Sequence, residues 1–165
     1  MHSDYAALCY GKWYSWENRH AQENISMPGI YAIMITHDDY SGRNFNWQDD
    51  ITYIGMTVAK SGLKGRLQQL ENSLVGKSGH SGGNRIREKF ISEGYGLYDT
   101  ANHQWSDGKK LFVCIQAITL NPMDSLPERL KKKGFVANLE YLAFAKYVET
   151  NPSHEMPSGN KAHSI

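Results

Sequence analysis

Two short stretches decide the fold of this 165-residue chain, Pro28-Gly-Ile-Tyr-Ala-Ile-Met-Ile35 and Ile51-Thr-Tyr-Ile-Gly55. The first has apolar residues on both of its faces, which is typical of a strand that is covered on both sides. The polar, turn-rich segment His37 to Asp50 predicts an extended hairpin connection between two strands. Because side chains alternate along a strand, Tyr31, Ile33 and Ile35 share one face, and Ile51, Tyr53 and Gly55 share another. In an antiparallel pair of suitable register, Tyr31 and Tyr53 project from the same side.

The segments after the second strand read as helices and one more strand. A stripe of leucines at helical spacing predicts a helix that buries Leu63, Leu67, Leu70 and Leu74. A second, short helix is predicted over roughly Asn84 to Glu93, ending at Gly94. The β-branched and apolar run from Leu111 to Leu120 predicts a third strand.

The two ends of the chain are also predicted to be helical. Ser125-Leu-Pro-Glu128 matches a capping box with proline in the first turn, so a helix begins there. Gly134 is a point where this helix can break before a second segment from Phe135 to about Glu149. At the other end, Trp13, Tyr14 and Trp16 suggest an amphipathic helix within the first 25 residues. Together these elements predict one α+β domain over residues 1–165, with a core of about 28–160 and a small, mainly antiparallel, three-stranded central sheet flanked by helices.

Composition fits a globular domain, with 40% hydrophobic and 21% charged residues. Cys9 and Cys114 are far apart and have no C-x-x-C partner, which favours free thiols in a reducing compartment. No apolar run approaches the ~20 residues of a membrane span, and the first ten residues do not resemble a signal peptide. We therefore expect a cytoplasmic protein with no membrane partner.

Positive charge is concentrated in one part of the chain, although the net charge is only +1. Residues 60–89 contain seven basic and two acidic residues, a net charge of +5. Such a segment is either a solvated basic face or a nucleic-acid-binding surface. The candidates for contacts with nucleic acid are Lys60, Lys64, Lys77, Arg85, Arg87 and Lys89.

The tripeptides Gly29-Ile-Tyr31 and Tyr53-Ile-Gly55 stand on neighbouring predicted strands and lead into Gly62-Leu-Lys-Gly-Arg66 and a glutamate on a late helix. This ordered combination resembles the GIY-YIG nuclease family, which is named for the two tripeptides. The resemblance spans roughly Pro28 to Asn160. It implies the GIY-YIG nuclease fold and an endonuclease that hydrolyses phosphodiester bonds in double-stranded DNA, with Mg²⁺ as cofactor and Mn²⁺ able to replace it.

The resemblance also implies an active site. Its residues, carried over by motif, are Tyr31, Tyr53, Arg66 and Glu140, with an asparagine near a proline after the glutamate helix. Asn160 is the preferred asparagine, and Asn151 is the alternative. The chain departs from the family pattern at Leu70, where many members carry a histidine or tyrosine. His80, in the glycine-rich loop from Gly76 to Gly83, can supply the missing polar group; otherwise it is a surface histidine without a role.

The chemistry of these residue types agrees with that site. A hard carboxylate such as Glu140 suits Mg²⁺, which keeps several waters and needs few protein ligands. A guanidinium such as Arg66 can donate two parallel hydrogen bonds to a phosphate. A tyrosine can act as general base if its pKa falls from about 10 toward neutrality. The sequence does not decide between the two; Tyr31 is favoured as the base, with Tyr53 holding the phosphate or the water.

Each of these residues also has a structural interpretation. Glu140 could be a core carboxylate paired with a lysine or arginine, Arg66 a surface arginine, and the tyrosines a cross-strand aromatic pair. Other chemistries fit poorly. Gly76-Lys-Ser78 lacks the first glycine of a P-loop, because Glu71 stands there, and no Cys/His spacing suits zinc.

Three functions therefore remain open. The preferred one is a restriction-type endonuclease, acting as a homodimer so that both strands are cut. The alternatives are a non-catalytic nucleic-acid-binding module on the same fold and a structure-specific nuclease for repair of branched DNA or for RNA.

Overall fold

The structure is a computed structural model that describes residues 4–161. Its centre is a four-stranded antiparallel sheet in the order β1-β4-β2-β3. The strands are β1 (Tyr14–Ser15), β2 (Gly29–Thr36), β3 (Ile51–Thr57) and β4 (Lys110–Ala117). The predicted α+β class is confirmed, and the two-residue strand β1 adds a fourth strand to the three predicted.

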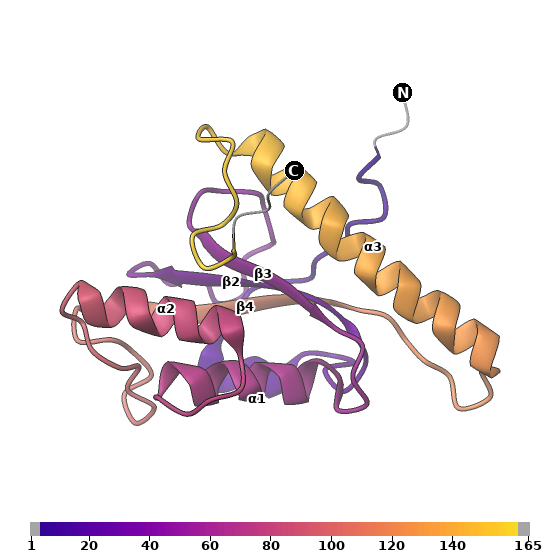
Figure 1. The fold of residues 1–165 in the computed structure, drawn as a ribbon, viewed down its shortest axis with the longest axis horizontal. Helices are drawn as coiled ribbons and strands as arrows, with labels where there is room; N and C mark the ends of the chain where they lie inside the picture. The colour runs from indigo at the N-terminus through magenta and orange to yellow at the C-terminus, as the bar shows by residue number, and fades with distance from the viewer. Residues whose placement is uncertain (1–3, 162–165) are drawn as a thin grey trace.

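Helices cover both faces of the sheet. Helices α1 (Gly62–Leu74) and α2 (Ser81–Ser92) lie on one side, and the long helix α3 (Leu126–Thr150) crosses the other side (Figure 1). A short 3₁₀ helix, η1 (Trp16–Ala21), packs near β1 and β4. The first part of α3 extends past the sheet, and Leu126 and Leu130 are exposed there.

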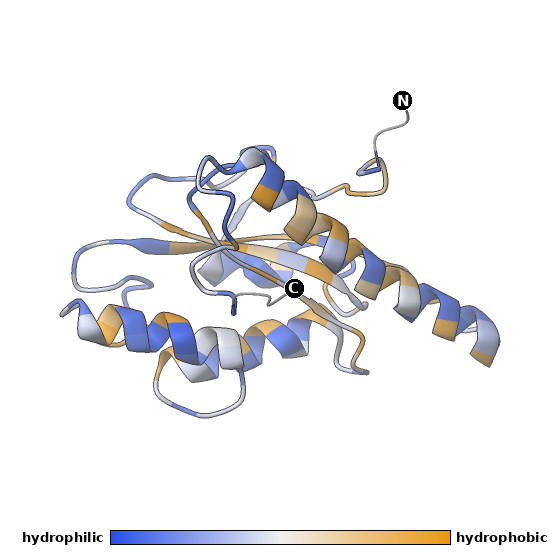
Figure 2. Cartoon of the chain, turned by 45° about the horizontal axis from the view of Figure 1, so that its top comes forward, coloured by the Kyte–Doolittle hydropathy of each residue, from blue (hydrophilic) through white to orange (hydrophobic). Residues whose placement is uncertain are grey.

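Strand β2 is the centre of the core because it pairs with both β3 and β4. Its residues from Gly29 to Met34 are all buried, as the sequence predicts for a strand covered on both faces. Alternate side chains enter two separate clusters, so Tyr31 and Ile33 pack toward α1 while Ile30 and Ala32 pack toward α3. Figure 2 shows this apolar band through the centres of the strands.

The register of β2 and β3 brings the two motif tyrosines together. Tyr31 lies opposite Gly55, and Ile33 lies opposite Tyr53, so the tyrosines are diagonal neighbours on one face. Their ring centroids are 5.9 Å apart. This confirms the predicted juxtaposition. The expectation that Ile51 shares their face is wrong, because a register shift between Ile33 and Met34 turns Ile51 into the cluster under α3.

The predicted amphipathic helix in the first 25 residues is wrong over the described part of that segment. Trp13 packs in the cluster under α3, whereas Trp16 packs in the cluster under α1, on the opposite face of the sheet. A single helical stripe cannot place its residues on both faces, but an edge strand between them can. The segment 37–50 also folds back toward this region. The ring of Phe45 stacks there on the ring of Tyr10, with 4.3 Å between the ring centroids.

The helix boundaries differ from those predicted in two places. Helix α2 starts at Ser81 rather than Asn84, because His80 caps it. Helix α3 runs without interruption from Leu126 to Thr150, so Gly134 does not break it. A mid-helix glycine costs only about 1 kcal/mol relative to alanine, and the capping box at Ser125 with the packing of the second half of α3 outweighs that cost.

Two further expectations can be compared with residues 4–161. None of the helices in that range is long and apolar enough to cross a membrane. Both cysteines are unpaired there, with Cys9 exposed and Cys114 buried in the sheet.

Candidate active site

The two tyrosines fit together because two glycines leave room for them. A Cβ atom on Gly55 would lie 2.7 Å from the hydroxyl oxygen of Tyr31 and 2.7 Å from Cε1 of Tyr53. A Cβ atom on Gly82, in the first turn of α2, would lie 2.3 Å from Cε2 of Tyr53. All three distances are shorter than real Cβ contacts, so no larger residue fits at either position without displacing a tyrosine. The start of α2 therefore packs directly on the ring of Tyr53.

His80 joins the start of α2 to Tyr31. The imidazole Nδ1 accepts a hydrogen bond from the backbone N–H of Gly83 at 2.9 Å, and this bond caps the helix. Nε2 lies 2.7 Å from the hydroxyl of Tyr31. The backbone N–H of His80 donates to Oγ of Ser73 on α1, 2.8 Å away. The structure thus brings the loop histidine to the tyrosines, as predicted from the absence of a polar residue at Leu70.

The hydrogen bonds of His80 fix its tautomer. Since Nδ1 accepts from a backbone N–H, it carries no proton, and a neutral imidazole then has its proton on Nε2. Burial, with the charges of Arg66 and Arg85, lowers the pKa of His80 to about 3, so the ring is neutral at physiological pH. His80 therefore donates from Nε2 to the oxygen of Tyr31 and is not itself a proton acceptor.

The two tyrosines differ in surroundings. Tyr31 is completely buried, and burial together with Tyr53 raises its pKa well above 10 despite the opposing charge of Arg66. Burial also raises the pKa of Tyr53, but Arg66, a hydrogen bond from Tyr31 and the charge of Arg85 oppose that rise. His80 thus donates a hydrogen bond to the oxygen of Tyr31, and the hydroxyl of Tyr31 donates one to the oxygen of Tyr53. Tyr53 is the ring with more cationic neighbours and some exposure, at 6%.

Arg66 lies beside this pair on α1. Its Nη1 donates to Oε1 of Gln69 at 3.0 Å, while its Nε is buried without a hydrogen-bond partner. No ion pair joins Arg66 to a carboxylate within residues 4–161. A guanidinium with one buried and unused donor is a ready site for an anion.

Glu140 approaches from α3, on the other side of the edge strand β3. The side chain is half-buried, and its carboxylate has neither a hydrogen bond nor an ion pair among the described residues. Burial raises the pKa of Glu140, and the charge of Arg66 opposes this. The charge of Glu140 in turn raises the pKa of Tyr53. The interpretation of Glu140 as a salt-bridged core residue therefore finds no partner in this part of the chain.

The residues present fit a metal ion that needs few protein ligands. Within residues 4–161 no cluster of three or more His, Cys, Asp or Glu side chains could enclose an ion. A partly buried carboxylate without a protein partner suits an ion such as Mg²⁺, which keeps most of its waters. Glu140 is the residue that would hold it.

Asn160 has a positioning role. Its Nδ2 donates to the carbonyl of Ile54 at 2.8 Å, and its Oδ1 accepts from the N–H of Ile54 at 2.9 Å. The side-chain amide thus pairs with the outer edge of β3 as another strand would, next to Tyr53. Asn151, the alternative, ends α3, and its Oδ1 accepts from the backbone N–H of Ser153. Asn160 is the asparagine that lies at the tyrosines, but its polar atoms are engaged by the backbone.

The six predicted nucleic-acid-binding residues differ in their surroundings. Arg85 points toward the site, where its Nε donates to the carbonyl of Gly159 at 2.9 Å and its charge acts on Tyr53 and His80. Arg87 faces α1 instead and donates to the carbonyl of Ser73. The lysines of the set are all exposed: Lys60, Lys64, Lys77 and Lys89.

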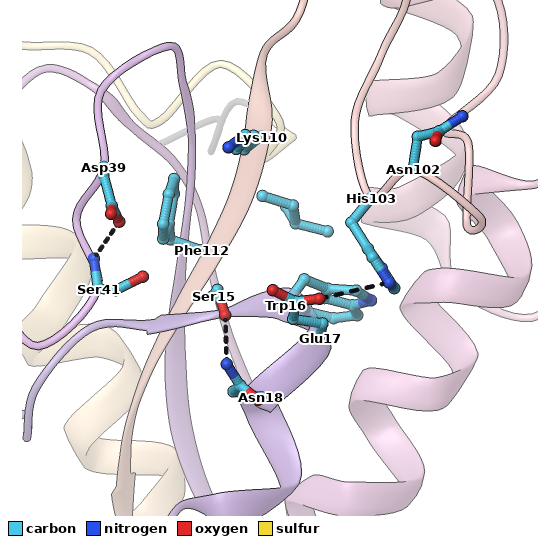
Figure 3. A pocket seen from close by; sticks show the side chains of 11 residues that line it. Ser15, Trp16, Glu17, Asn18, Asp39, Ser41, Asn102, His103, Lys110 and Phe112 are labelled. Atoms are coloured by element: carbon cyan, nitrogen blue, oxygen red, sulfur yellow. Dashed lines mark hydrogen bonds and ion pairs between the residues drawn. The ribbon is translucent and has the colours of Figure 1, made fainter.

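A separate hollow lies at the opposite edge of the sheet, beside β1 and β4 (Figure 3). Its volume is about 220 Å³. Its polar side chains pair mainly with one another, as His103 with Glu17 at 3.5 Å and Ser15 with Asn18 at 3.1 Å. None of the residues carried over from the tripeptide motifs lines this hollow.

A scan against protein-family models matched no family, and comparisons with the curated proteins and with the solved structures gave no match either. The resemblance to GIY-YIG nucleases therefore stays a prediction from the motifs and from the side chains that they bring together.

Proposed function

We propose that this protein is a metal-dependent endonuclease of the GIY-YIG type that hydrolyses phosphodiester bonds in DNA. The observation that carries the proposal is the meeting, at the edge of β3, of three polar groups that can act on a phosphate or on its attacking water. These are the partnerless carboxylate of Glu140, the unpaired Nε of Arg66 and the hydroxyl of Tyr53. A buried unpaired polar group costs about 1–3 kcal/mol, and a bound phosphate would give the Nε of Arg66 its missing partner.

The scissile phosphate would bind at Arg66. Its guanidinium neutralises negative charge on the non-bridging oxygens, and that charge increases as water attacks phosphorus. Arg85 adds a second positive charge near Tyr53. A bound divalent ion at Glu140 would supply Lewis-acid stabilisation of the phosphate and a more acidic water.

Tyr53 is the better candidate for the general base. The sequence favoured Tyr31, but Tyr31 is completely buried and its oxygen already accepts from His80. Tyr31 can then donate its own proton to the oxygen of Tyr53, which favours the phenolate form of Tyr53. The phenolate accepts the proton of the attacking water, and His80 holds Tyr31 in the donating orientation. Asn160 holds β3, and with it Tyr53, in register.

The test is cleavage of supercoiled plasmid with Mg²⁺ or Mn²⁺ by the wild-type protein, Glu140→Ala and Glu149→Ala. Glu149 lies on the same helix and is exposed, so it is the matched control. We expect Glu140→Ala to lose cleavage by about a thousandfold or more and Glu149→Ala to keep it. Equal activity of the wild type and Glu140→Ala would refute the assigned site.

The product pattern separates the functional alternatives. Discrete bands support a restriction-type enzyme, for which a homodimer would allow both strands to be cut. Cleavage of branched substrates or RNA in preference to plasmid supports the structure-specific nuclease. Salt-sensitive DNA binding without cleavage in either metal supports the non-catalytic module and contradicts the proposal.

A further inference from the structure

A second hollow lies where the ends of three strands meet the start of α3. Its volume is about 450 Å³, within the range of small-molecule sites. It is walled by the segment before β2, the segment after β3 and the segment after β4. Pro28, Val58 and Pro122 contribute apolar surface from these three segments. The floor is therefore mainly hydrophobic.

Cations surround this apolar floor. Arg129 on α3 is held in place by the backbone, since its Nε donates to the carbonyl of Asp124 at 3.1 Å and its Nη2 to that of Pro122 at 3.1 Å. Lys60 and Lys133 also line the hollow, and neither forms an ion pair within the described range 4–161. No acidic side chain lines it. The hollow thus suits a group with an apolar body and a negative charge.

The hollow lies in line with the candidate active site. Lys133 and Glu140 are seven residues apart on α3, which places them on the same side of the helix and about 10 Å apart along its axis. Val58 follows the end of β3, the strand that carries Tyr53. A nucleic acid strand advances about 3.4 Å per nucleotide, so about three nucleotides span this separation.

We propose that this hollow holds one unpaired nucleotide of the strand that the active site cleaves, about three nucleotides from the scissile phosphate. The base packs on the apolar floor, and Lys60 and Lys133 contact its phosphate. This inference rests on the proposed function and adds a substrate preference to it. A base that is already unpaired enters at lower cost than one that must leave a duplex. The enzyme then prefers DNA with an unpaired nucleotide near the cut over a continuous duplex.

The test is binding of two fluorescein-labelled DNA hairpins, measured by anisotropy without divalent metal. One hairpin is fully paired, and the other carries a single unpaired nucleotide in its stem. Each is titrated with the wild-type protein, Lys133→Glu and Lys131→Glu. Lys131 is exposed on the same helix and does not line the hollow, so it controls for the change of charge.

We expect the wild type to bind the hairpin with the unpaired nucleotide about fivefold or more tightly than the paired one. Lys133→Glu should abolish this preference, and Lys131→Glu should keep it. Equal affinity of the wild type for both hairpins, or a preference that survives in Lys133→Glu, would overturn the inference. Because the readout is binding without metal, it is independent of cleavage. A wild-type protein that cleaves DNA but shows no preference would refute the role of the hollow alone, and a wild-type preference without any cleavage would refute the proposed function alone.

Discussion

The two faces of the sheet are built from the same strands but carry different kinds of contact. Under α3, Ile30 and Ala32 of β2 meet Val136 and Leu139, and the contacts are apolar. On the face toward α1 and α2, β2 presents Tyr31, whose hydroxyl is hydrogen-bonded to the buried side chain of His80. Both faces bury an apolar cluster, but the face toward α1 and α2, here called the polar face, also holds a hydrogen-bonded chain of one histidine and two tyrosines. Under the proposed function, this chain of polar groups is the part of the sheet that serves catalysis.

The largest effect on stability should come from the apolar face. Leu139→Ala removes a completely buried side chain between α3 and the sheet and should lower the free energy of unfolding by about 2–5 kcal/mol. Tyr31→Phe, on the polar face, should cost less, about 1–3 kcal/mol, because it leaves Nε2 of His80 unpaired. Urea denaturation of both variants measures the contrast. A larger loss in Tyr31→Phe would show that the polar face is the stabilising one.

Gly82→Ala should disturb the polar face by displacing the ring of Tyr53. The added Cβ would lie 2.3 Å from Cε2 of Tyr53, so the tyrosine must move. We expect the single-turnover cleavage rate to fall about a hundredfold. Gly134→Ala is the control, since a Cβ there meets nothing within 4 Å and should stabilise α3 by about 1 kcal/mol. Unchanged cleavage by Gly82→Ala would mean that the position of Tyr53 does not matter.

A smaller, pH-dependent effect should come from His80. Its pKa is about 3 in the folded protein and about 6.5 in a free histidine, so the unfolded chain binds more protons between those values. The stability that neutral His80 contributes is fully present above pH 6.5 and is lost as the pH falls toward 3, by up to about 1.4 kcal/mol per unit.

His80→Asn tests this dependence, because asparagine keeps a helix cap but cannot titrate. Denaturation at pH 6.5 and pH 5 should show the wild type losing about 1–2 kcal/mol more than the variant. A parallel loss in both proteins would contradict a neutral, buried histidine.

The strands and the tyrosine pair could be predicted from sequence because both depend on a two-residue period in a short stretch. The cap at His80 was missed because imidazole is not among the usual capping groups, so the helix appeared to begin at Asn84. The glycines that follow it were the available signal for close packing. The clamp between Asn160 and Ile54 joins residues 106 positions apart, and no local pattern encodes such a contact. The predicted N-terminal amphipathic helix was wrong for a related reason. The local sequence does not show that Trp13 and Trp16 pack on opposite faces of the sheet.

The most direct test is the rate of cleavage after Tyr53→Phe, a substitution that removes only the hydroxyl oxygen of Tyr53. Single-turnover cleavage of labelled duplex DNA with Mg²⁺ is compared for the wild type, Tyr53→Phe and Tyr95→Phe, the last a half-buried tyrosine that packs on Phe90. We expect Tyr53→Phe to lose about 10²–10⁴ in rate while its unfolding free energy changes by only about 1 kcal/mol, and Tyr95→Phe to keep the wild-type rate. Cleavage by Tyr53→Phe at the wild-type rate would contradict the assignment of the polar face to phosphodiester hydrolysis.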